Sequence, residues 1–180
     1  ASQRGTMACC TIRRIVELVK EHGYGASGEF RTFADPDEVW IFEVLGEGPD
    51  KIGGVWAAVR IPDDHVSGSA NISCISTLDL KDKDNYMASA NVFDVAKKMG
   101  FWDGKEPFRF WKAYSGGNYF GELKSFSLRE FFILNSLAPS LKLSYDSEEL
   151  PLSVKPDKQV AVTDVMALLR DTYDGTAWDT

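Results

Sequence analysis

Two segments of this chain are apolar on both sides of a strand, and they limit the folds that it can adopt. Residues 39–45 are β-branched, aromatic and apolar, with Glu43 as the one exception, and residues 54–61 have a similar character. A strand that is apolar on both faces is buried on both, as in a sheet packed between two layers. The sequence therefore predicts a sheet that is covered on each side.

Helical patterns lie on either side of these strands. Ile12, Ile15, Val16 and Val19 recur at the spacing of one helix face, and Gly23 ends the pattern. The same periodicity predicts later helices over residues 90–99, 108–114 and 128–137, and from residue 163 to about 173–175. Ser127 and Glu130 are predicted to form a capping box at the start of helix 128–137.

Two further segments complete the expected sheet. Residues 29–34 and 66–75 have strand character, which predicts an antiparallel meander of four strands over residues 28–75, whereas residues 78–86 are charged and typical of a loop. A helix, then strands, then helices is the order of an α+β fold. We expect one domain over residues 1–180, with residues 1–10 as a flexible tail.

The composition excludes some classes of function. The chain is 44% apolar and 26% charged, with a formal net charge of -7, which argues against a nucleic-acid groove. No stretch approaches the roughly 20 apolar residues that span a bilayer, and residues 1–10 lack a signal-peptide core. The three cysteines, Cys9, Cys10 and Cys74, form a poor disulfide framework, so reduced thiols and a cytoplasmic setting are favoured. The two histidines are isolated, so we expect no metal site and no cofactor.

The polar residues between the apolar runs are the candidates for chemistry. Asn71, with Ser69 and other small neighbours before it, is able to donate to a developing oxyanion, or else it caps a turn. Arg60 either binds a carboxylate or projects to solvent. Glu43 in its apolar strand needs a partner, for which Arg60 is a candidate.

A thiol–imidazole pair of Cys74 and His65 is a further alternative. Such a pair needs only proximity in space. A free cysteine inside an apolar strand, however, is usually a small buried hydrophobic residue. Both interpretations of Cys74 stay open at the level of sequence.

Several ordered segments resemble one family. They are ADPDEVWIFE from residue 34, GVWAAVRIPD from residue 54, AN at residues 70–71, SANVF from residue 89, LAPSL from residue 137, SVKPD from residue 153 and VMALLRD from residue 165, with GT at residues 175–176. Together they resemble the dipeptidase family of N-terminal-nucleophile cysteine hydrolases, over about residues 11–178. The resemblance implies a four-layer αββα sandwich and hydrolysis of dipeptides or other short amides. It also implies a nucleophilic cysteine at the mature N-terminus, whose own α-amine is the base, with Asn71 close to that nucleophile.

The chain departs from the family pattern in ways that matter for activity. The family carries its nucleophile at the start of a strand, well upstream of the matched region, whereas Cys10 runs directly into the predicted helix. Cys74 and Ser69 stand where the family often has a basic residue and a histidine. We therefore expect an internal fragment of such a hydrolase that lacks the nucleophile and is inactive alone. Arg60, Glu43 and Ser69 are the expected contacts for a short peptide substrate.

A different class of function stays open beside this one. A non-catalytic peptide-binding or interaction module, or one half of a two-chain assembly, would suit a sheet that leaves an edge exposed. Association of copies through that edge is the corresponding expectation.

Overall fold

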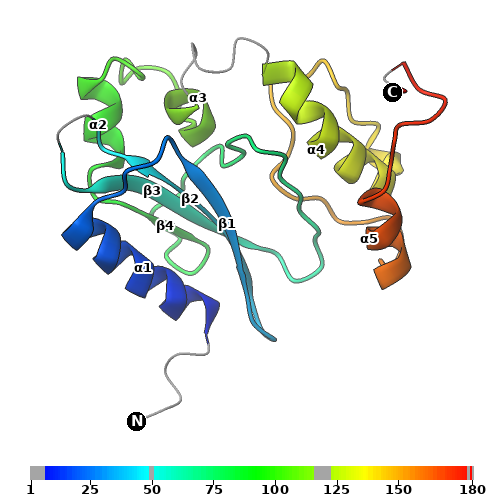
Figure 1. Cartoon of the computed structure of the whole chain (residues 1–180), viewed down its shortest axis with the longest axis horizontal. Coiled ribbons are helices and arrows are strands. Elements are labelled where there is room, and N and C mark those ends of the chain that lie inside the picture. Colours follow the sequence, from blue (N-terminus) through cyan, green and yellow to red (C-terminus); the bar gives the residue numbers. More distant parts are fainter. Residues whose placement is uncertain (1–6, 49–50, 116–122, 178, 180) are drawn as a thin grey trace.

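The centre of the molecule is a four-stranded antiparallel sheet with the strand order β1-β2-β3-β4 (Figure 1). The computed structural model describes residues 7–48, 51–115, 123–177 and 179. Its strands are β1 (Glu29–Ala34), β2 (Val39–Gly46), β3 (Gly54–Ile61) and β4 (Tyr86–Ala88). The three predicted strands between residues 29 and 61 are confirmed, as is the α+β class.

Helices cover both faces of the sheet. On one face, α1 (Ala8–His22) packs Ile12 and Val19 against Trp40, Phe42 and Val44. Burying each such side chain stabilises the fold by about 1.5–3 kcal/mol. This packing explains why the side chains of β2 that face α1 are apolar, as are most of those on the opposite face of the sheet.

The opposite face of the sheet carries Ile41, Val55, Ala57 and Val59. It is covered by α2 (Val92–Lys98), α3 (Phe110–Tyr114) and the segment around Ile75. We call this the inner face, because the candidate site lies on it. The predicted burial of the sheet on both sides is confirmed.

The first turn of α1 is held by the turn between β1 and β2. The Ala8 N–H donates to Asp35 Oδ2 at 2.6 Å, and the Cys9 N–H donates to Glu38 Oε1 at 2.9 Å. Carboxylates at a helix N-terminus satisfy its free amides and complement its dipole. Residues 8–10 therefore belong to the helix and not to the predicted tail, while residues 1–6 lie outside the described residues.

A second group of helices lies beside the sheet, on the side of β1 in the view of Figure 1. It contains α4 (Leu123–Leu137), a 3₁₀ turn η1 (Pro139–Leu141) and α5 (Val162–Leu168), with a small core of Leu134, Ala138 and Val154. The predicted capping box is wrong, because α4 begins at Leu123 and Ser127 is inside it. The last helix is also shorter than predicted and ends at Leu168. The sequence also predicts a glycine-rich loop at residues 115–121, which lies outside the described residues except for Ser115, the residue that ends α3.

The fourth predicted strand is wrong. Residues 66–75 are irregular apart from a single bridge between Val66 and Val154, and the last strand of the sheet is β4 instead. The amides of Cys74 and Ile75 donate to the Glu43 carboxylate, so they are not available to a strand ladder. The Glu43 carboxylate, on β2, thus accepts the backbone hydrogen bonds that a neighbouring strand would otherwise accept.

The described residues contain one sheet, with helices on both sides. The four-layer αββα sandwich expected from the family resemblance therefore goes beyond what this structure contains. In the described part of the chain, no helix combines the length and the apolar character needed to cross a membrane.

Candidate functional site

A cavity of ≈ 650 Å³ opens on the inner face of the sheet, between β1, β2 and the segment 69–73. Three of the residues predicted from sequence line it: Glu43, Ser69 and Asn71. Its wall mixes hydroxyl, amide and apolar groups, which is typical of a pocket for a small polar ligand. The full lining comprises Ser27, Gly28, Glu29, Phe30, Glu43, Val44, Leu45, Ser69, Asn71, Ile72, Ser73, Tyr114 and Ser115.

The segment that carries Asn71 is tied down at its upstream end by residues 152–154. Val66 and Val154 exchange backbone hydrogen bonds of 2.8 and 2.9 Å. The Ser67 hydroxyl donates to Leu152 O at 2.5 Å, and His65 Nδ1 lies 2.9 Å from Ser153 Oγ. These contacts fix where the segment enters the cavity wall.

At its downstream end, Glu43 holds the same segment against the sheet. Glu43 Oε1 accepts from the Cys74 and Ile75 amides at 2.8 and 3.0 Å, and the Ser73 hydroxyl donates to Oε2. Glu43 is only 4% exposed, so these bonds replace the water that its carboxylate has lost. Glu43 is therefore a structural anchor of the wall, with its oxygens already occupied.

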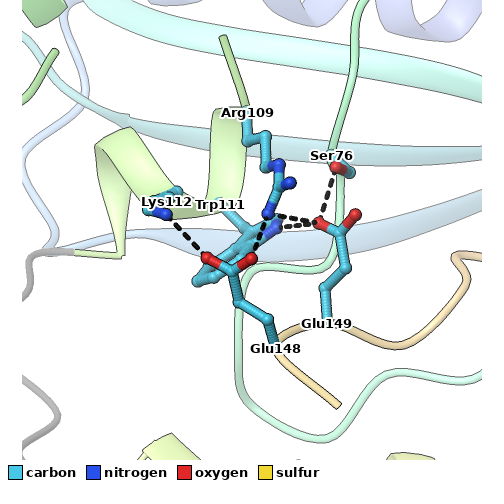
Figure 2. Close-up of polar contacts among 6 residues, drawn as sticks. All are labelled: Ser76, Arg109, Trp111, Lys112, Glu148 and Glu149. Carbon is cyan, nitrogen blue, oxygen red and sulfur yellow. Dashed lines mark hydrogen bonds and ion pairs between the residues drawn. The ribbon is translucent and has the colours of Figure 1, made fainter. Parts of the chain in front are cut away.

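A second carboxylate contacts the next residue of the segment, Ser76, as Figure 2 shows. Glu149 Oε2 accepts from Ser76 Oγ at 2.8 Å and from Trp111 Nε1 at 2.7 Å. Glu148 beside it accepts from Arg109 at 2.8 Å and from Lys112 at 2.6 Å. These two ion pairs lower the pKa of Glu148 to about 2. The network joins the end of the segment to α3.

Asn71 has a backbone and a side chain that are both constrained. Its φ of 62° lies in the left-handed region, which asparagine tolerates better than most residues. Arg129 Nη2, from α4, donates to Ala70 O at 3.0 Å and to Asn71 Oδ1 at 3.2 Å. Because the amide oxygen accepts from Arg129, the Asn71 NH₂ group is the side that is left to act as a donor.

A close backbone approach brings α4 to this segment. A Cβ on Gly68 would lie 2.8 Å from Ile133 Cγ2, which is too short for a real contact. Glycine therefore allows the helix that carries Arg129 to pack against the cavity wall.

Two buried carboxyls and a thiol lie together behind the wall. Burial and, to a smaller extent, the nearby Glu43 together raise the pKa of Glu130 to about 8. Burial also raises the pKa of Glu43, against the hydrogen bonds that lower it. Burial and both carboxyls raise the pKa of Cys74 well above its usual value, so this thiol is a poor nucleophile.

The structure separates Arg60 from the other predicted site residues. Glu43 faces Ala57 across β2 and β3, whereas Arg60 faces Trp40, so Arg60 and Glu43 point to opposite faces of the sheet. Arg60 Nη2 instead donates to Asp63 Oδ1 at 2.6 Å. The predicted Arg60–Glu43 pair is therefore wrong, and Arg60 does not line the cavity.

None of the three thiols is placed as a nucleophile beside Asn71. Cys74 Sγ lies 3.4 Å from Glu43 Oε1, while His65 contacts Ser153, so the Cys74–His65 pair considered from sequence is not formed. Cys9 and Cys10 belong to α1, on the face of the sheet opposite the cavity. Burial and Glu38 raise the pKa of Cys9 to about 11. Within the described part of the chain, no group of three or more His, Cys, Asp or Glu side chains is arranged to hold a metal ion.

Sequence reasoning missed Arg129 and misassigned Glu130. Arg129 lies 58 residues from Asn71 in the chain, so no local spacing connects the two. The available signal was a pair of adjacent charges in the otherwise apolar stretch SLREFFIL. Charges in such a stretch must be paired, neutralised or exposed, and here one binds Asn71 and the other is buried.

A family model for peptidase family C69 matches residues 3–180. The chain belongs to peptidase family C69. This membership agrees with the resemblance that the sequence motifs carry.

Individual C69 relatives agree with the family match. A probable dipeptidase B of Streptococcus pyogenes serotype M1 is 32% identical over 165 residues, covering 89% of this chain and 30% of that protein. A probable dipeptidase of Salmonella dublin is 31% identical, covering 91% and 36%, and one of Latilactobacillus sakei is 26% identical, covering 93% and 34%. The chain thus spans about a third of the length of these relatives.

Proposed function

We propose that this chain forms one wall of a dipeptidase site of the cysteine, N-terminal-nucleophile type, in which Asn71 stabilises the oxyanion or orients the α-amine that serves as the base. The observation that carries the proposal is the Asn71–Arg129 contact at the cavity wall. A preorganised donor at a developing oxyanion contributes about 3 kcal/mol to transition-state stabilisation. The names of the relatives, which are probable dipeptidases, support this choice of substrate class.

The proposed reaction is an acyl transfer. The α-amine of the nucleophilic cysteine takes the proton from its own thiol and becomes an α-ammonium. The resulting thiolate attacks the carbonyl carbon of the scissile amide, and the electron pair of the C=O bond moves to oxygen, where the Asn71 NH₂ group donates a hydrogen bond. Collapse of this intermediate expels the amine, which takes up a proton from the α-ammonium of the nucleophile. Water then releases the acyl group and regenerates the thiol.

We assign the nucleophile to a part of the protein outside these 180 residues. Cys74 is buried among carboxyls, and Cys9 and Cys10 lie across the sheet from Asn71. Glu43 serves as an anchor for the wall, while Ser69 lies within it and can contact a bound peptide. The expected four-layer sandwich would then be completed by residues beyond this chain.

An assay of dipeptide hydrolysis, in which the release of free amine is measured, tests the proposal. The natural gene product that contains this sequence is expected to cleave dipeptides, and the isolated 180-residue chain is not. Activity of the isolated chain that disappears in Cys10→Ala would show that the nucleophile assignment is wrong. If the gene product cleaved no dipeptide, the proposed function would be wrong.

A second candidate, association through an apolar surface, has its own observation. On α5, Val162 is 77% exposed, and Leu169, just after the helix, is 81% exposed. A binding module or one half of a two-chain assembly would use such a surface. Light scattering distinguishes the candidates, because a monomer at high concentration contradicts self-association.

A further inference from the structure

The outer edge of β1 borders the cavity and is unpaired in the described part of the sheet. β1 is the end strand in the order β1-β2-β3-β4. The Asp35 N–H donates to Glu38 O at 3.0 Å and closes the hairpin, so the odd-numbered residues of β1 bond to β2. Phe30 and Thr32 therefore direct their N–H and C=O groups away from the sheet.

Hollows lie beside this edge on both faces of the sheet. On the inner face is the cavity described above, which Phe30 and Glu43 line as opposed residues of β1 and β2. On the α1 face is a smaller hollow of ≈ 220 Å³, lined by Ile15, Val19, Tyr24, Glu29, Arg31, Phe33, Phe42 and Val44. A strand added to β1 would place alternate side chains on the two faces, one set towards each hollow.

The composition of the hollows indicates the chemistry of the added strand. Among the described residues that line the larger cavity are two carboxyl residues, Glu29 and Glu43, and no Lys, Arg or His, so an acidic ligand gains no ion pair from this lining. Its apolar residues include Phe30, Leu45 and Ile72, and the smaller hollow is mostly apolar. Both therefore suit uncharged, apolar side chains.

We propose that the edge of β1 binds an extended peptide with a free amino end and apolar side chains, as an added antiparallel strand. The residue opposite Phe30 exchanges both backbone hydrogen bonds with it and turns its side chain into the cavity beside Asn71. This assignment rests on the proposed function for its relevance to catalysis, because it gives the orientation in which a peptide substrate meets Asn71. The binding mode itself comes from the strand edge and the two hollows.

The test is a titration of the 180-residue chain with the peptide Leu-Ala-Leu-Ala-amide, followed by amide NMR. Thr32→Pro removes one outward N–H, and Thr32→Ala is the matched control that keeps it. Thr32 is exposed, and an edge strand tolerates proline at an outward position. The expected result is binding about tenfold weaker for Thr32→Pro and unchanged for Thr32→Ala, with equal melting temperatures.

Peptide variants provide a readout that does not depend on protein mutations. Methylation of every second peptide amide is expected to weaken binding about tenfold, while methylation of the alternate amides changes it less than about twofold. A succinylated peptide, which carries a carboxylate in place of the ammonium, is expected to bind about tenfold more weakly.

Three results would each overturn the inference. The first is an equal effect of the two methylation patterns, and the second is no binding at millimolar peptide. The third is a chain that pairs with its own copy at β1 and does not bind the peptide. Dipeptide hydrolysis separates this outcome from failure of the proposed function. Binding at β1 by a gene product that cleaves no dipeptide leaves the inference intact and removes the function. Cleavage of dipeptides without peptide binding at β1 would overturn the inference and leave the proposed function intact.

Discussion

Replacing Glu43 should loosen the cavity wall, and the size of the effect follows from its hydrogen bonds. In Glu43→Met the side chain keeps a similar length but cannot accept from the Cys74 and Ile75 amides, which are 2.8 and 3.0 Å away. Both residues are buried, so each unpaired N–H costs about 1–3 kcal/mol. Removal of a buried carboxylate offsets part of this loss. We expect a net destabilisation of about 3 kcal/mol, a large share of the roughly 5–15 kcal/mol of a typical domain.

Glu43→Gln is the matched control for this prediction. Its amide oxygen can still accept from both backbone N–H groups, and the Ser73 hydroxyl can turn to accept from the new NH₂ group. The expected loss is below about 1 kcal/mol. Urea unfolding gives the two free energies, and hydrogen exchange at residues 74 and 75 with alkylation of Cys74 reports the local opening. If Glu43→Met were as stable and as protected as the wild type, Glu43 would not be the anchor of this segment.

Three further predictions concern the surroundings of the site. The pKa of Glu130 in the folded state is raised from 4.5 to about 8, so between these pH values the folded state binds more protons than the unfolded state. The free energy of unfolding therefore falls as pH rises from 4.5 to 8, by up to roughly 5 kcal/mol. Glu130→Gln should flatten this pH dependence in urea titrations, and an unchanged slope would contradict the prediction. The pKa of Glu148 is lowered to about 2, so its contribution to stability is present above pH 4.5 and is lost as pH falls towards 2. Glu148→Gln should raise the pH midpoint of acid unfolding, whereas Asp84→Asn, an exposed residue outside this network, should leave the midpoint unchanged. Gly68→Ala should destabilise by about 1–3 kcal/mol through contact with Ile133, and Ile133→Leu in the same chain, which lacks the Cγ2 methyl group, should recover part of this loss in thermal melts.

The sheet was largely predictable because its signal is local. The apolar pattern of residues 29–61 is enough to place β1, β2 and β3, and helix periodicity places α1 and α2 to within a few residues. β4 was missed because its three residues lie at the end of a charged stretch and are fixed by pairing with β3. The false strand at residues 66–75 has strand-like composition, but a carboxylate from β2 binds its amides, which no local pattern reveals.

The candidate site was predictable in part for a similar reason. Asn71, Ser69 and Glu43 stood out by residue type within apolar surroundings, and all three line the cavity. Arg60 stood out in the same way but lies on the other face, which strand register decides and composition does not. Arg129 and Glu130 come from a helix far along the chain; the packing of α4 at Gly68 brings Arg129 to Asn71, and Glu130 lies near Glu43 and Cys74.

The turnover number of the natural gene product carrying Asn71→Gly tests the central claim most directly. Glycine accepts the left-handed backbone at φ 62° and removes the Asn71 side chain, while Arg129 can still donate to Ala70 O, so folding should be preserved. We predict that kcat for dipeptide hydrolysis falls about 10²- to 10³-fold in Asn71→Gly, with little change in KM. A kcat equal to that of the wild type, in a protein with the same melting temperature, would contradict the role assigned to Asn71.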